Sequence, residues 1–453
     1  MKQTDVLIIG TSAAGATAAI TVRRHYPEVS MIAVRKEEHT PVPCGIPYIL
    51  TTVGSCEKNL MSDDVFAKNN VELLIGEVTA LDLAAHTATL VPNGSGESET
   101  IQYRKLILGT GSSPIVPPIP GVDLPGVYMA CKDPVYLNNV LSAVHAARRL
   151  VFVGGGLVGL ELAEEASKRG LETAVVELLP HPLELVFDED LILRAERELV
   201  RLGIAMHTGR KVTAIEGKGK VESVLLDDGS RLPADLVMLA IGVTPNIALA
   251  QAAGLTADPR RGIAVDRFMR TSHPDVFAAG DCASKVSYFT GLPTNVKLAS
   301  VAAAEARVAA ANLFELRRQY PGVVGVYSTK IGELAMGLVG LGEKAASSIG
   351  IPYIAGYAEA ADHHPASMPG TKTLGAKLIF ARDTARLIGG QVCCSDSTGE
   401  IVNIISTMVQ QGMTAEDIAT TQIGTHPALN ASPVAYQLIN AAEMALVSLR
   451  KAH

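Results

Sequence analysis

Two stretches of the chain share one pattern of apolar and small residues. Each begins with a short apolar run, at residues 6–9 and 150–153, which leads into a glycine-rich turn and then into apolar residues at helical spacing. Short apolar runs bounded by glycine are typical of strands buried on both faces of a parallel sheet. The pattern therefore predicts two βαβ units, each with a helix directly after its glycine turn.

Both turns match the dinucleotide-binding fingerprint G-x-G-x-x-G, in which a helix N-terminus faces a pyrophosphate. The second copy is complete, with Gly154, Gly156 and Gly159. The first copy has Gly10 and Gly15, but Ser12 stands at its middle position. One such turn could be a glycine-rich loop without a ligand. Two copies, each between a strand and a helix, predict two dinucleotide sites.

The residue that ends the next strand of each unit bears on the cofactor. An acid that accepts from a ribose hydroxyl is expected there. In the second unit the strand at 173–176 ends at Glu177, which fits NADH. In the first unit the strand at 30–34 ends at Arg35, which cannot accept a hydrogen bond. Arg35 must therefore hold the adenosine half of the cofactor in another way or point away from it.

Two further apolar strands end in small polar turns. The strand at 106–108 runs into Thr110 and Gly111, and the proline-rich stretch at 114–120 then predicts a linker out of the first domain. The strand at 276–278 leads to Gly280 and Asp281, whose carboxylate can accept from a ribityl or ribose hydroxyl. Without the rest of the pattern, Gly280 and Asp281 would fit an ordinary turn equally well.

Composition narrows the class of protein. With 453 residues, of which 48% are hydrophobic and 19% charged, the chain is long enough for two or three well-cored domains. The net charge is −7, no run of Lys or Arg exceeds a pair, and Trp is absent, so we expect no nucleic-acid partner. No apolar run reaches the length of a membrane helix, so we expect no membrane span.

The cysteines are scattered without a CxxC pattern, which predicts neither a metal site nor a disulfide scaffold. They are Cys44, Cys56, Cys131, Cys282, Cys393 and Cys394. A reducing cytoplasm is the simplest compartment. Cys393 and Cys394 could form a disulfide between neighbours, but strained adjacent pairs are rare, so we expect inert thiols there.

Cys44 is the candidate redox residue. It opens the segment Cys44-Gly45-Ile46-Pro47-Tyr48, and proline is tolerated in the first turn of a helix. We therefore expect Cys44 at a helix N-terminus, where unpaired N–H groups and the helix dipole favour the reactive thiolate. Taken alone, the segment fits a buried structural cysteine equally well. The nucleotide-binding patterns around it favour the redox interpretation.

The order of these motifs resembles that of the FAD- and NAD(P)-dependent pyridine nucleotide-disulfide oxidoreductases over nearly the whole chain. The order is a weakened fingerprint, a cysteine, Thr-Gly-Ser, a complete fingerprint, Ala-x-Gly-Asp and a C-terminal domain. The segment at Cys44 resembles the single-cysteine branch, which contains coenzyme A-disulfide reductases, NADH oxidases and persulfide or polysulfide reductases. The paired-cysteine branch has a second cysteine where this chain has Ile49.

The resemblance implies an α/β fold with two Rossmann-like dinucleotide-binding domains, one inserted in the other, and an α+β C-terminal dimerisation domain. Residues 1–117 and 245–325 would bind FAD, residues 118–244 would bind NAD(P)H, and residues 326–453 would form the dimer. FAD would contact Gly10, Gly15, Thr110, Gly111 and Asp281, and NADH would contact Gly154, Gly156, Gly159 and Glu177. Further candidates for cofactor contacts are Ser12, Ala14, Arg35, Pro43, Val158, Glu161, Gly242 and Gly280.

The C-terminal domain carries candidate proton donors. His364 lies where related single-cysteine enzymes often carry Tyr-Tyr-Pro, and His426 with Pro427 resembles the His-Pro of the paired-cysteine branch, although Ala431 replaces the Glu of that branch. Imidazole titrates near neutral pH, so His426, more than His364, is the candidate that protonates a leaving thiol in the partner subunit. Tyr436 is a third candidate, and each of the three could instead be a surface or core residue.

Together these features predict a homodimeric flavoprotein that passes electrons from NADH through FAD to a small sulfur substrate at Cys44. NADPH is less favoured, because Glu177 would repel a 2′-phosphate. The acceptor stays open among coenzyme A disulfide, persulfide and polysulfide; Arg23 and Arg24 could meet coenzyme A phosphates or be an ordinary solvated pair. The alternatives are an NADH oxidase or peroxidase in which Cys44 cycles through a sulfenic acid, and a flavin redox sensor without catalysis.

Overall fold

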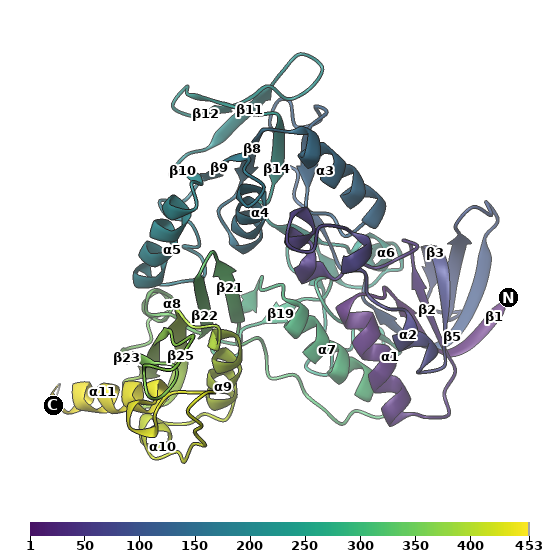
Figure 1. Ribbon diagram of the computed structural model, residues 1–453. Coiled ribbons are helices and arrows are strands. Elements are labelled where there is room, and N and C mark those ends of the chain that lie inside the picture. The colour runs from purple at the N-terminus through teal and green to yellow at the C-terminus, as the bar shows by residue number, and fades with distance from the viewer. Residues whose placement is uncertain (452–453) are drawn as a thin grey trace. The chain divides into compact units, whose positions relative to one another are not determined.

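The computed structural model describes residues 1–451, which divide into two compact units (Figure 1). The first unit comprises residues 1–118, 126–147 and 238–323, and the second comprises the remaining described residues. The chain first leaves the first unit at residue 118, within the predicted proline-rich linker. The second unit contains most of the predicted NAD(P)H domain together with the C-terminal domain, so the division into three domains stays a prediction.

A six-stranded mixed sheet forms the core of the first unit (Figure 1). Its parallel part has the order β18-β5-β1-β2-β3, and β4 pairs antiparallel with both β3 and β5. Residues 6–9 of β1 are at most 7% exposed, as two-sided burial requires. The strands are β1 (Lys2–Ile9), β2 (Met31–Arg35), β3 (Val71–Asp82), β4 (Thr87–Pro92), β5 (Glu99–Leu108) and β18 (Val276–Ala278).

Helices α1 (Ala13–His25) and α7 (Ala299–Ala311) lie side by side in the first unit (Figure 1). Both helices are rich in buried alanines, which leave room for this packing. The other α-helices of the unit are α2 (Asp64–Ala67), α3 (Pro134–Ala146) and α6 (Ala248–Ala252). Its short strands are β6 (Ser112–Pro114), β7 (Val127–Met129), β15 (Val243–Pro245), β16 (Ala257–Asp258), β17 (Gly262–Ile263), β19 (Lys285–Val286) and β20 (Pro293–Thr294).

The second unit begins with the second predicted βαβ pattern. Strands β8 (Arg149–Val153), β9 (Glu172–Glu177) and β10 (Ala205–Thr208) pair in parallel, with α4 (Leu157–Ser167) after β8 and α5 (Glu189–Arg201) after β9. An antiparallel sheet follows, made of β11 (Val212–Glu216), β12 (Ser223–Leu226) and β13 (Arg231–Pro233). Along β14 (Leu236–Leu239) the chain returns to the first unit.

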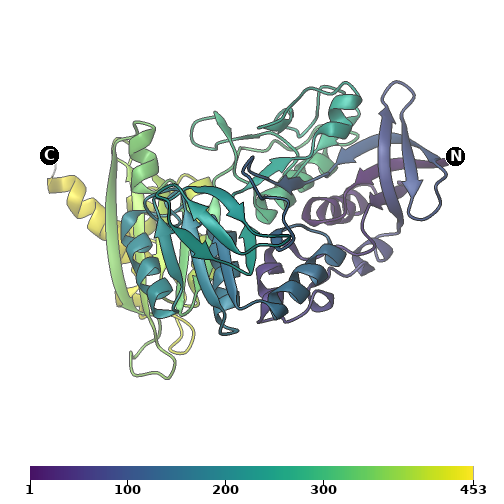
Figure 2. The same ribbon diagram turned by 90° about the horizontal axis from the view of Figure 1, so that it is seen from above.

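The C-terminal part of the second unit is a five-stranded antiparallel sheet of order β21-β22-β25-β24-β23. Helices α9 and α11 pack against it (Figures 1 and 2). A Cβ on Gly337 would lie 2.3 Å from Val402 of α9, and one on Gly356 would lie 1.9 Å from the Ala441 carbonyl of α11. The elements are β21 (Val326–Ile331), β22 (Leu334–Gly340), α8 (Glu343–Ser348), β23 (Tyr353–Ala361), β24 (Thr373–Ala381), β25 (Leu387–Cys393), α9 (Thr398–Gln410), α10 (Ala415–Ala419) and α11 (Gln437–Lys451).

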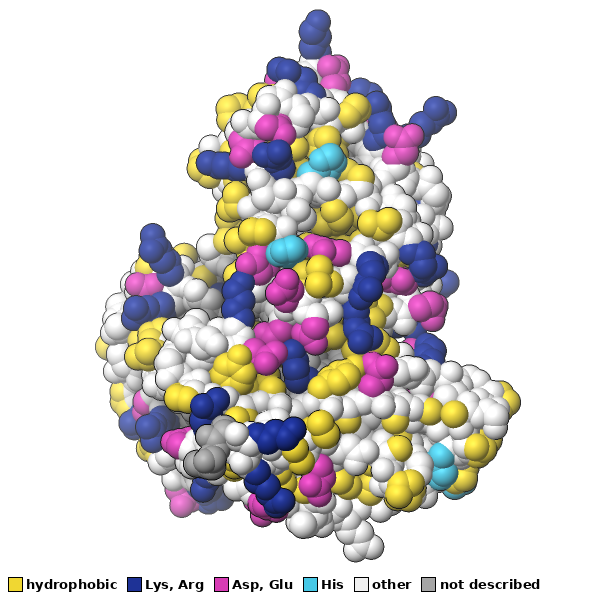
Figure 3. Space-filling model, turned by 90° about the vertical axis from the view of Figure 1, so that its left-hand side faces the viewer, with side chains coloured by type: hydrophobic (Ala, Val, Ile, Leu, Met, Phe, Trp, Pro, Cys, Tyr) yellow, Lys and Arg dark blue, Asp and Glu magenta, His cyan; other side chains and the backbone are white. Residues whose placement is uncertain are grey.

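The predicted fold class, α/β with an α+β C-terminal domain, is confirmed. Among residues 1–451, no helix combines the length and apolar character that a membrane crossing requires. On the face drawn in Figure 3, basic and acidic side chains are interspersed and no large area carries one sign. That face therefore lacks the continuous basic surface typical of nucleic-acid binding.

Backbone segments after β1, β5 and β18 approach one another with little room for side chains. A Cβ on Gly10 would lie 2.1 Å from the carbonyl oxygen of Gly109, and one on Gly15 would lie 1.8 Å from the carbonyl oxygen of Gly10. A Cβ on Gly280 would lie 3.2 Å from the Cβ of Ala14. Larger residues at Gly10 and Gly15 would therefore force the backbone to move.

We expect Gly15→Ala to lower the stability of the protein, because its Cβ would overlap the Gly10 carbonyl and displace α1. Overpacking of this kind costs about 1–3 kcal/mol. The matched control is Gly399→Ala, which also lies in the first turn of a helix but is exposed, with nothing within 4 Å of the added Cβ. This control should leave stability unchanged or raise it by up to about 1 kcal/mol. Thermal unfolding compares the two, and equal melting temperatures would contradict the expectation.

Candidate functional site

The turn after β18 carries Asp281, the predicted acceptor for a sugar hydroxyl. Ser112 Oγ donates a hydrogen bond to Asp281 Oδ2 at 2.7 Å, and Lys132 Nζ lies 3.2 Å from the same oxygen. Burial acts to raise the pKa of Asp281, but Lys132 and Ser112 outweigh it and hold the pKa below its usual value. Asp281 is therefore an ionised acceptor at neutral pH.

A buried ion pair holds the backbone of Gly280. The Gly280 N–H donates to Glu305 Oε2 at 2.8 Å, while Lys285 Nζ donates to the Gly280 carbonyl at 2.6 Å and to Glu305 Oε2 at 3.1 Å. Both side chains are at most 3% exposed. Burial raises the pKa of Glu305 to about 7, against the lowering effect of Lys285. Sequence patterns do not reveal this pair, because a charged residue such as Glu305 in an alanine-rich helix normally faces solvent.

The residues around the first glycine turn fit a bound FAD. Ser12 is the N-cap residue of α1, but its side chain accepts no hydrogen bond from the N–H groups of the first helical turn. Gly111 has φ +70, and nothing lies within 4 Å of an added Cβ there. A pyrophosphate supplies acceptors at such a helix start, and Asp281 can accept from sugar hydroxyls.

Thr110 and Gly242, both predicted to contact a cofactor, lie in the segments next to β6 and β15. Thr110 Oγ1 donates to the Asn246 carbonyl at 2.7 Å, and Asn246 Nδ2 donates to the Thr110 carbonyl at 2.9 Å. Gly242 has φ +107, which favours glycine there. These contacts stabilise the turns, and direct contact with a cofactor stays a prediction.

Arg35 has a structural role, and its contact with a cofactor stays a prediction. Its side chain is 3% exposed and pairs with Asp63 through both Nη atoms. It also donates to the carbonyls of Glu37 and Glu38. These bonds use most of the N–H donors of its guanidinium. Arg35 therefore ties the end of β2 to the following segment.

Arg23 likewise has a structural role, and its contact with coenzyme A stays a prediction. Its guanidinium donates to the carbonyls of Pro27, Val29, Asn69 and Asn70. Basic residues near a helix C-terminus often satisfy carbonyl groups in this way. Arg24 is exposed, and its contact with coenzyme A stays a prediction.

Glu177 closes the second glycine turn. Its Oε2 accepts from the Gly155 N–H at 2.5 Å, and its Oε1 accepts from the Leu179 N–H at 2.8 Å. Gly154 has φ +111, and Gly156 is the N-cap of α4, where nothing lies within 4 Å of an added Cβ. The uncapped helix start and the fixed carboxylate fit the pyrophosphate and the adenosine ribose of NADH.

Helix α4 carries three further predicted cofactor contacts. Gly159 is buried, and Val158 is 45% exposed in the first turn. Glu161 accepts a hydrogen bond from Thr329 Oγ1 of β21 at 2.8 Å, and burial raises its pKa. Glu161 thus has a partner within the protein, and its contact with NADH stays a prediction.

Cys44 lies in a short 3₁₀ helix, η1 (Pro43–Gly45), which is followed by a second, η2 (Pro47–Leu50). The sequence predicts the start of a single helix at Cys44, whereas the structure has two short 3₁₀ helices. Pro43 and Pro47 each begin one of them, because the restricted φ of proline suits the first position of a helical turn. Cys44 is exposed, so the alternative of a buried structural cysteine is wrong.

Asn59 anchors the segment that carries Cys44. Its Nδ2 donates to the Val42 carbonyl at 3.1 Å, and the Val42 N–H donates to the Asn59 carbonyl at 2.7 Å. Asn59 is 7% exposed, and a Cβ on Gly45 would lie 1.9 Å from its Oδ1. Glycine beside Cys44 is therefore required by the close approach of Asn59. The sequence shows only an asparagine in a later loop, which carries no signal of this contact.

Asn430 joins the two loops that carry His364 and His426. Its carbonyl oxygen lies 2.9 Å from His364 Nδ1, and its Oδ1 accepts from the His426 N–H at 2.8 Å. The His364 N–H also donates to the Pro427 carbonyl at 3.2 Å. The structure thus brings both candidate histidines into one loop cluster of the second unit. The FAD candidates and Cys44 belong to the first unit.

Hydrogen bonds assign different tautomers to the two neutral histidine rings. A carbonyl oxygen only accepts, so His364 Nδ1 carries the proton and its Nε2 is an acceptor. The Ala428 N–H donates to His426 Nδ1 at 3.2 Å, so His426 Nε2 carries the proton. His426 is exposed and can donate from Nε2. Burial raises the pKa of Tyr436, which makes it a weaker acid than an exposed tyrosine.

Two protein-family models match the chain. The model described as pyridine nucleotide-disulphide oxidoreductase matches residues 4–306, and the dimerisation domain of that family matches residues 326–435. The NADH oxidase of Methanocaldococcus jannaschii is 30% identical over 450 residues, which cover 98% of this chain and 99% of the relative. The CoA-dependent NAD(P)H sulfur oxidoreductase of Pyrococcus furiosus is 30% identical over 433 residues, which cover 94% of this chain and 96% of the relative.

Among solved structures, an NAD-dependent persulfide reductase from A. fulgidus matches with a TM-score of 0.90 and 26% identity, over 99% of this chain and 83% of that chain. The relatives thus divide between NADH oxidases and sulfur or persulfide reductases. The glycine turns, the fold and both family models agree, and this chain belongs to the pyridine nucleotide-disulphide oxidoreductase family as an NAD(P)H-dependent flavoprotein oxidoreductase.

Proposed function

We propose that this protein uses NADH to reduce a small sulfur compound through Cys44. The observation that carries the proposal is the exposed Cys44, held by the contact of Gly45 with Asn59 in the same unit as the FAD candidates. The relatives named as sulfur oxidoreductase and persulfide reductase support this class of acceptor. Coenzyme A disulfide belongs among the candidate acceptors, because the relative from P. furiosus is named as CoA-dependent.

The sulfur chemistry follows from a thiolate at Cys44. The Cys44 sulfur attacks one sulfur of a disulfide R–S–S–R′, forms a Cys44–S–S–R bond and releases R′S⁻. With a persulfide or polysulfide, the group left on Cys44 is a persulfide. FAD, when bound, would supply the electron pair from NADH; the Cys44–S–S–R bond then breaks, RS⁻ leaves and Cys44 returns to the thiolate.

We infer that His426 of a second subunit donates a hydrogen bond from Nε2 to the leaving thiolate. Its Nε2 carries the proton in the neutral ring, whereas His364 Nε2 is an acceptor. The raised pKa of Tyr436 makes that residue the poorer donor. The match to the dimerisation domain of the family supports a homodimer in which the two chains complete each other's sites.

A second candidate function is oxidation of NADH by oxygen or peroxide. The NADH oxidase of M. jannaschii, matched over 98% of this chain, favours it. The Cys44 thiolate would then attack the O–O bond of a peroxide, become a sulfenic acid and release water or an alcohol. Both candidate functions use the same thiol and differ in the acceptor.

Steady-state rates with NADH should be highest with a sulfur acceptor, in a panel of coenzyme A disulfide, persulfide, polysulfide, hydrogen peroxide and oxygen. Cys44→Ser should abolish reduction of the sulfur acceptors and still allow NADH to bleach the flavin, because hydride transfer does not need the thiol. The control is Cys131→Ser, at a half-exposed cysteine whose pKa burial raises. Near-normal sulfur reduction by Cys44→Ser would exclude Cys44, and a preference for peroxide or oxygen would favour the second function.

NADH should be preferred over NADPH by about 10- to 100-fold in kcat/KM, because the Glu177 carboxylate would face the 2′-phosphate of NADPH and repel it. Each tenfold step in kcat/KM corresponds to about 1.4 kcal/mol. Glu177→Gln combined with Leu178→Arg should reduce or reverse the preference. Leu178 is 64% exposed and can accept a long side chain. Glu177→Gln alone keeps the size of the side chain and serves as the control for charge. An equal or better kcat/KM with NADPH in the unmodified protein would contradict the role of Glu177.

Mixing two inactive variants, Cys44→Ser and His426→Ala, under conditions that exchange subunits should restore part of the activity. Some heterodimers then contain one site with both Cys44 and His426. His364→Ala serves as the comparison variant. His364 Nε2 accepts hydrogen bonds and does not donate them, so this variant should lose less activity than His426→Ala. No recovery after proven subunit exchange, or full activity of His426→Ala alone, would refute the role of His426 across the dimer.

A further inference from the structure

Cys393 and Cys394, expected from the sequence to be inert, have unequal surroundings at the end of β25. Cys393 is the last residue of the strand and is 2% exposed, whereas Cys394 is half-buried. Cys394 has φ +80, and its N–H donates to the Ala335 carbonyl at 2.8 Å. This turn leaves one sulfur in the core and brings the other to α5 of the same unit.

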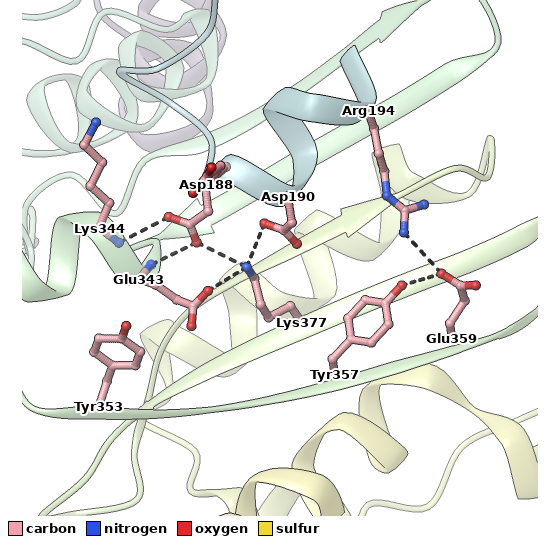
Figure 4. Close-up of a pocket in the computed structure, with 10 residues that line it drawn as sticks. Asp188, Asp190, Arg194, Glu343, Lys344, Tyr353, Tyr357, Glu359 and Lys377 are labelled. Carbon is pink, nitrogen blue, oxygen red and sulfur yellow. Dashed lines mark hydrogen bonds and ion pairs between the residues drawn. The ribbon is translucent and has the colours of Figure 1, made fainter. Parts of the chain in front are cut away.

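Arg194 of α5 contacts the sulfur of Cys394. Its Nη1 lies 3.2 Å from Cys394 Sγ, and its Nη2 lies 3.5 Å from Glu359 Oε2. Tyr357 donates to the same carboxylate, and Figure 4 shows Arg194 pointing from α5 toward Glu359. Arg194, Tyr357 and Glu359 line an open cleft of about 830 Å³. Small solutes can therefore reach the guanidinium that contacts the sulfur.

This arrangement favours ionisation of one thiol of the pair. The hydrogen bond from Cys393 and the charge of Arg194 together lower the pKa of Cys394 to about 6, although burial opposes them. The same hydrogen bond, followed by burial, raises the pKa of Cys393. At neutral pH the pair is therefore a thiolate beside a thiol.

Neighbouring cysteines also serve as metal ligands, but the surroundings of this pair disfavour that use. Arg194 brings a positive charge to Cys394, which repels a cation. Across residues 1–451, no group of three or more His, Cys, Asp or Glu side chains is placed to hold a metal ion. A thiolate with a cation on one side and a thiol on the other suits reaction with an electrophile better.

We propose that Cys394 and Cys393 form a peroxide-sensitive dithiol, a second thiol site besides Cys44. The Cys394 sulfur attacks an oxygen of a hydroperoxide ROOH, the O–O bond breaks, and Cys394 becomes a sulfenic acid while the alkoxide takes a proton and leaves as ROH. The Cys393 thiol then attacks the Cys394 sulfur, forms a disulfide and releases water. In sum, two thiols lose an electron pair and two hydrogens, and one peroxide is reduced to alcohol and water.

A thiol with a lowered pKa reacts with electrophiles faster than an ordinary thiol, and this difference in rate is greatest below neutral pH. At about pH 6, roughly half of a thiol with this lowered pKa is thiolate, against about 0.3% of an ordinary thiol with a pKa of about 8.5. Its lower basicity reduces its nucleophilicity about tenfold, for a Brønsted slope of about 0.45. The remaining rate advantage at that pH is roughly tenfold, which makes a pH profile the sharper test.

The first experiment measures alkylation of Cys394 by iodoacetamide from pH 5 to 9, in the reduced full-length holoprotein, with site-resolved mass spectrometry. The rate should have its inflection near pH 6 in the unmodified protein and move toward about pH 8.5 in Arg194→Met. The matched control is Arg197→Met on the same helix, whose guanidinium donates to the Leu193 carbonyl. It should keep the profile of the unmodified protein. An ordinary inflection in the unmodified protein would overturn the proposal without any variant.

The second experiment follows oxidation by a brief pulse of hydrogen peroxide at about pH 6.5. The peptide that holds both cysteines should lose about 2 Da and regain it with dithiothreitol. Cys393→Ser should instead accumulate a sulfenic acid on Cys394 that dimedone traps, and Cys394→Ser should leave Cys393 unmodified. If Cys394 does not react while Cys44 does, or if it passes directly to a sulfinic acid, the dithiol is excluded. Neither result depends on the acceptor used at Cys44.

Discussion

The close approach of backbone segments around Ala14 is the constraint on which the first unit depends. Gly10 and Gly15 have no room for a Cβ, because carbonyl oxygens occupy that space. Gly280 meets Ala14 from the end of β18, a strand far along the chain from β1. Small residues at these positions let the helix start, the β5 turn and the Gly280–Asp281 turn lie at one end of the sheet. That arrangement puts N–H groups and a carboxylate where a dinucleotide needs them.

The buried pair of Lys285 and Glu305 serves this geometry more than it serves stability. Buried ion pairs contribute little net stability, because desolvation offsets their attraction. Here the raised pKa of Glu305 means that folding favours the protonated carboxyl. The stability that the protonated Glu305 contributes is therefore present below about pH 4.5 and is lost as pH rises toward 7. In return, both polar groups of the Gly280 backbone have partners inside the core. The side chain of the neighbouring Asp281 is held by Ser112 and Lys132.

The sequence predicts the parts of this protein that follow a repeating pattern. Apolar runs bounded by glycine locate β1, β8 and β18, since strand burial and glycine turns are both visible in order along the chain. The contacts that Arg35 and Arg23 make could not be predicted, because a sequence does not show that Asp63 or distant carbonyls take their donors. Asn59 and Asn430 were missed for a related reason. Each is a polar residue in a loop, and its role exists only once two loops meet.

Ile49 lies in η2, where the paired-cysteine enzymes have a second cysteine. Ile49 is 1% exposed, so its side chain belongs to the core of the segment that displays Cys44. A thiol at that position would be buried beneath the turn. In the proposed function, the sulfur partner of Cys44 therefore comes from a substrate. The Cys393–Cys394 pair is the opposite case, because it contains its own second thiol and a cation, Arg194. In the proposed scheme, Cys44 therefore needs a small molecule to complete a disulfide, whereas the dithiol needs only an oxidant.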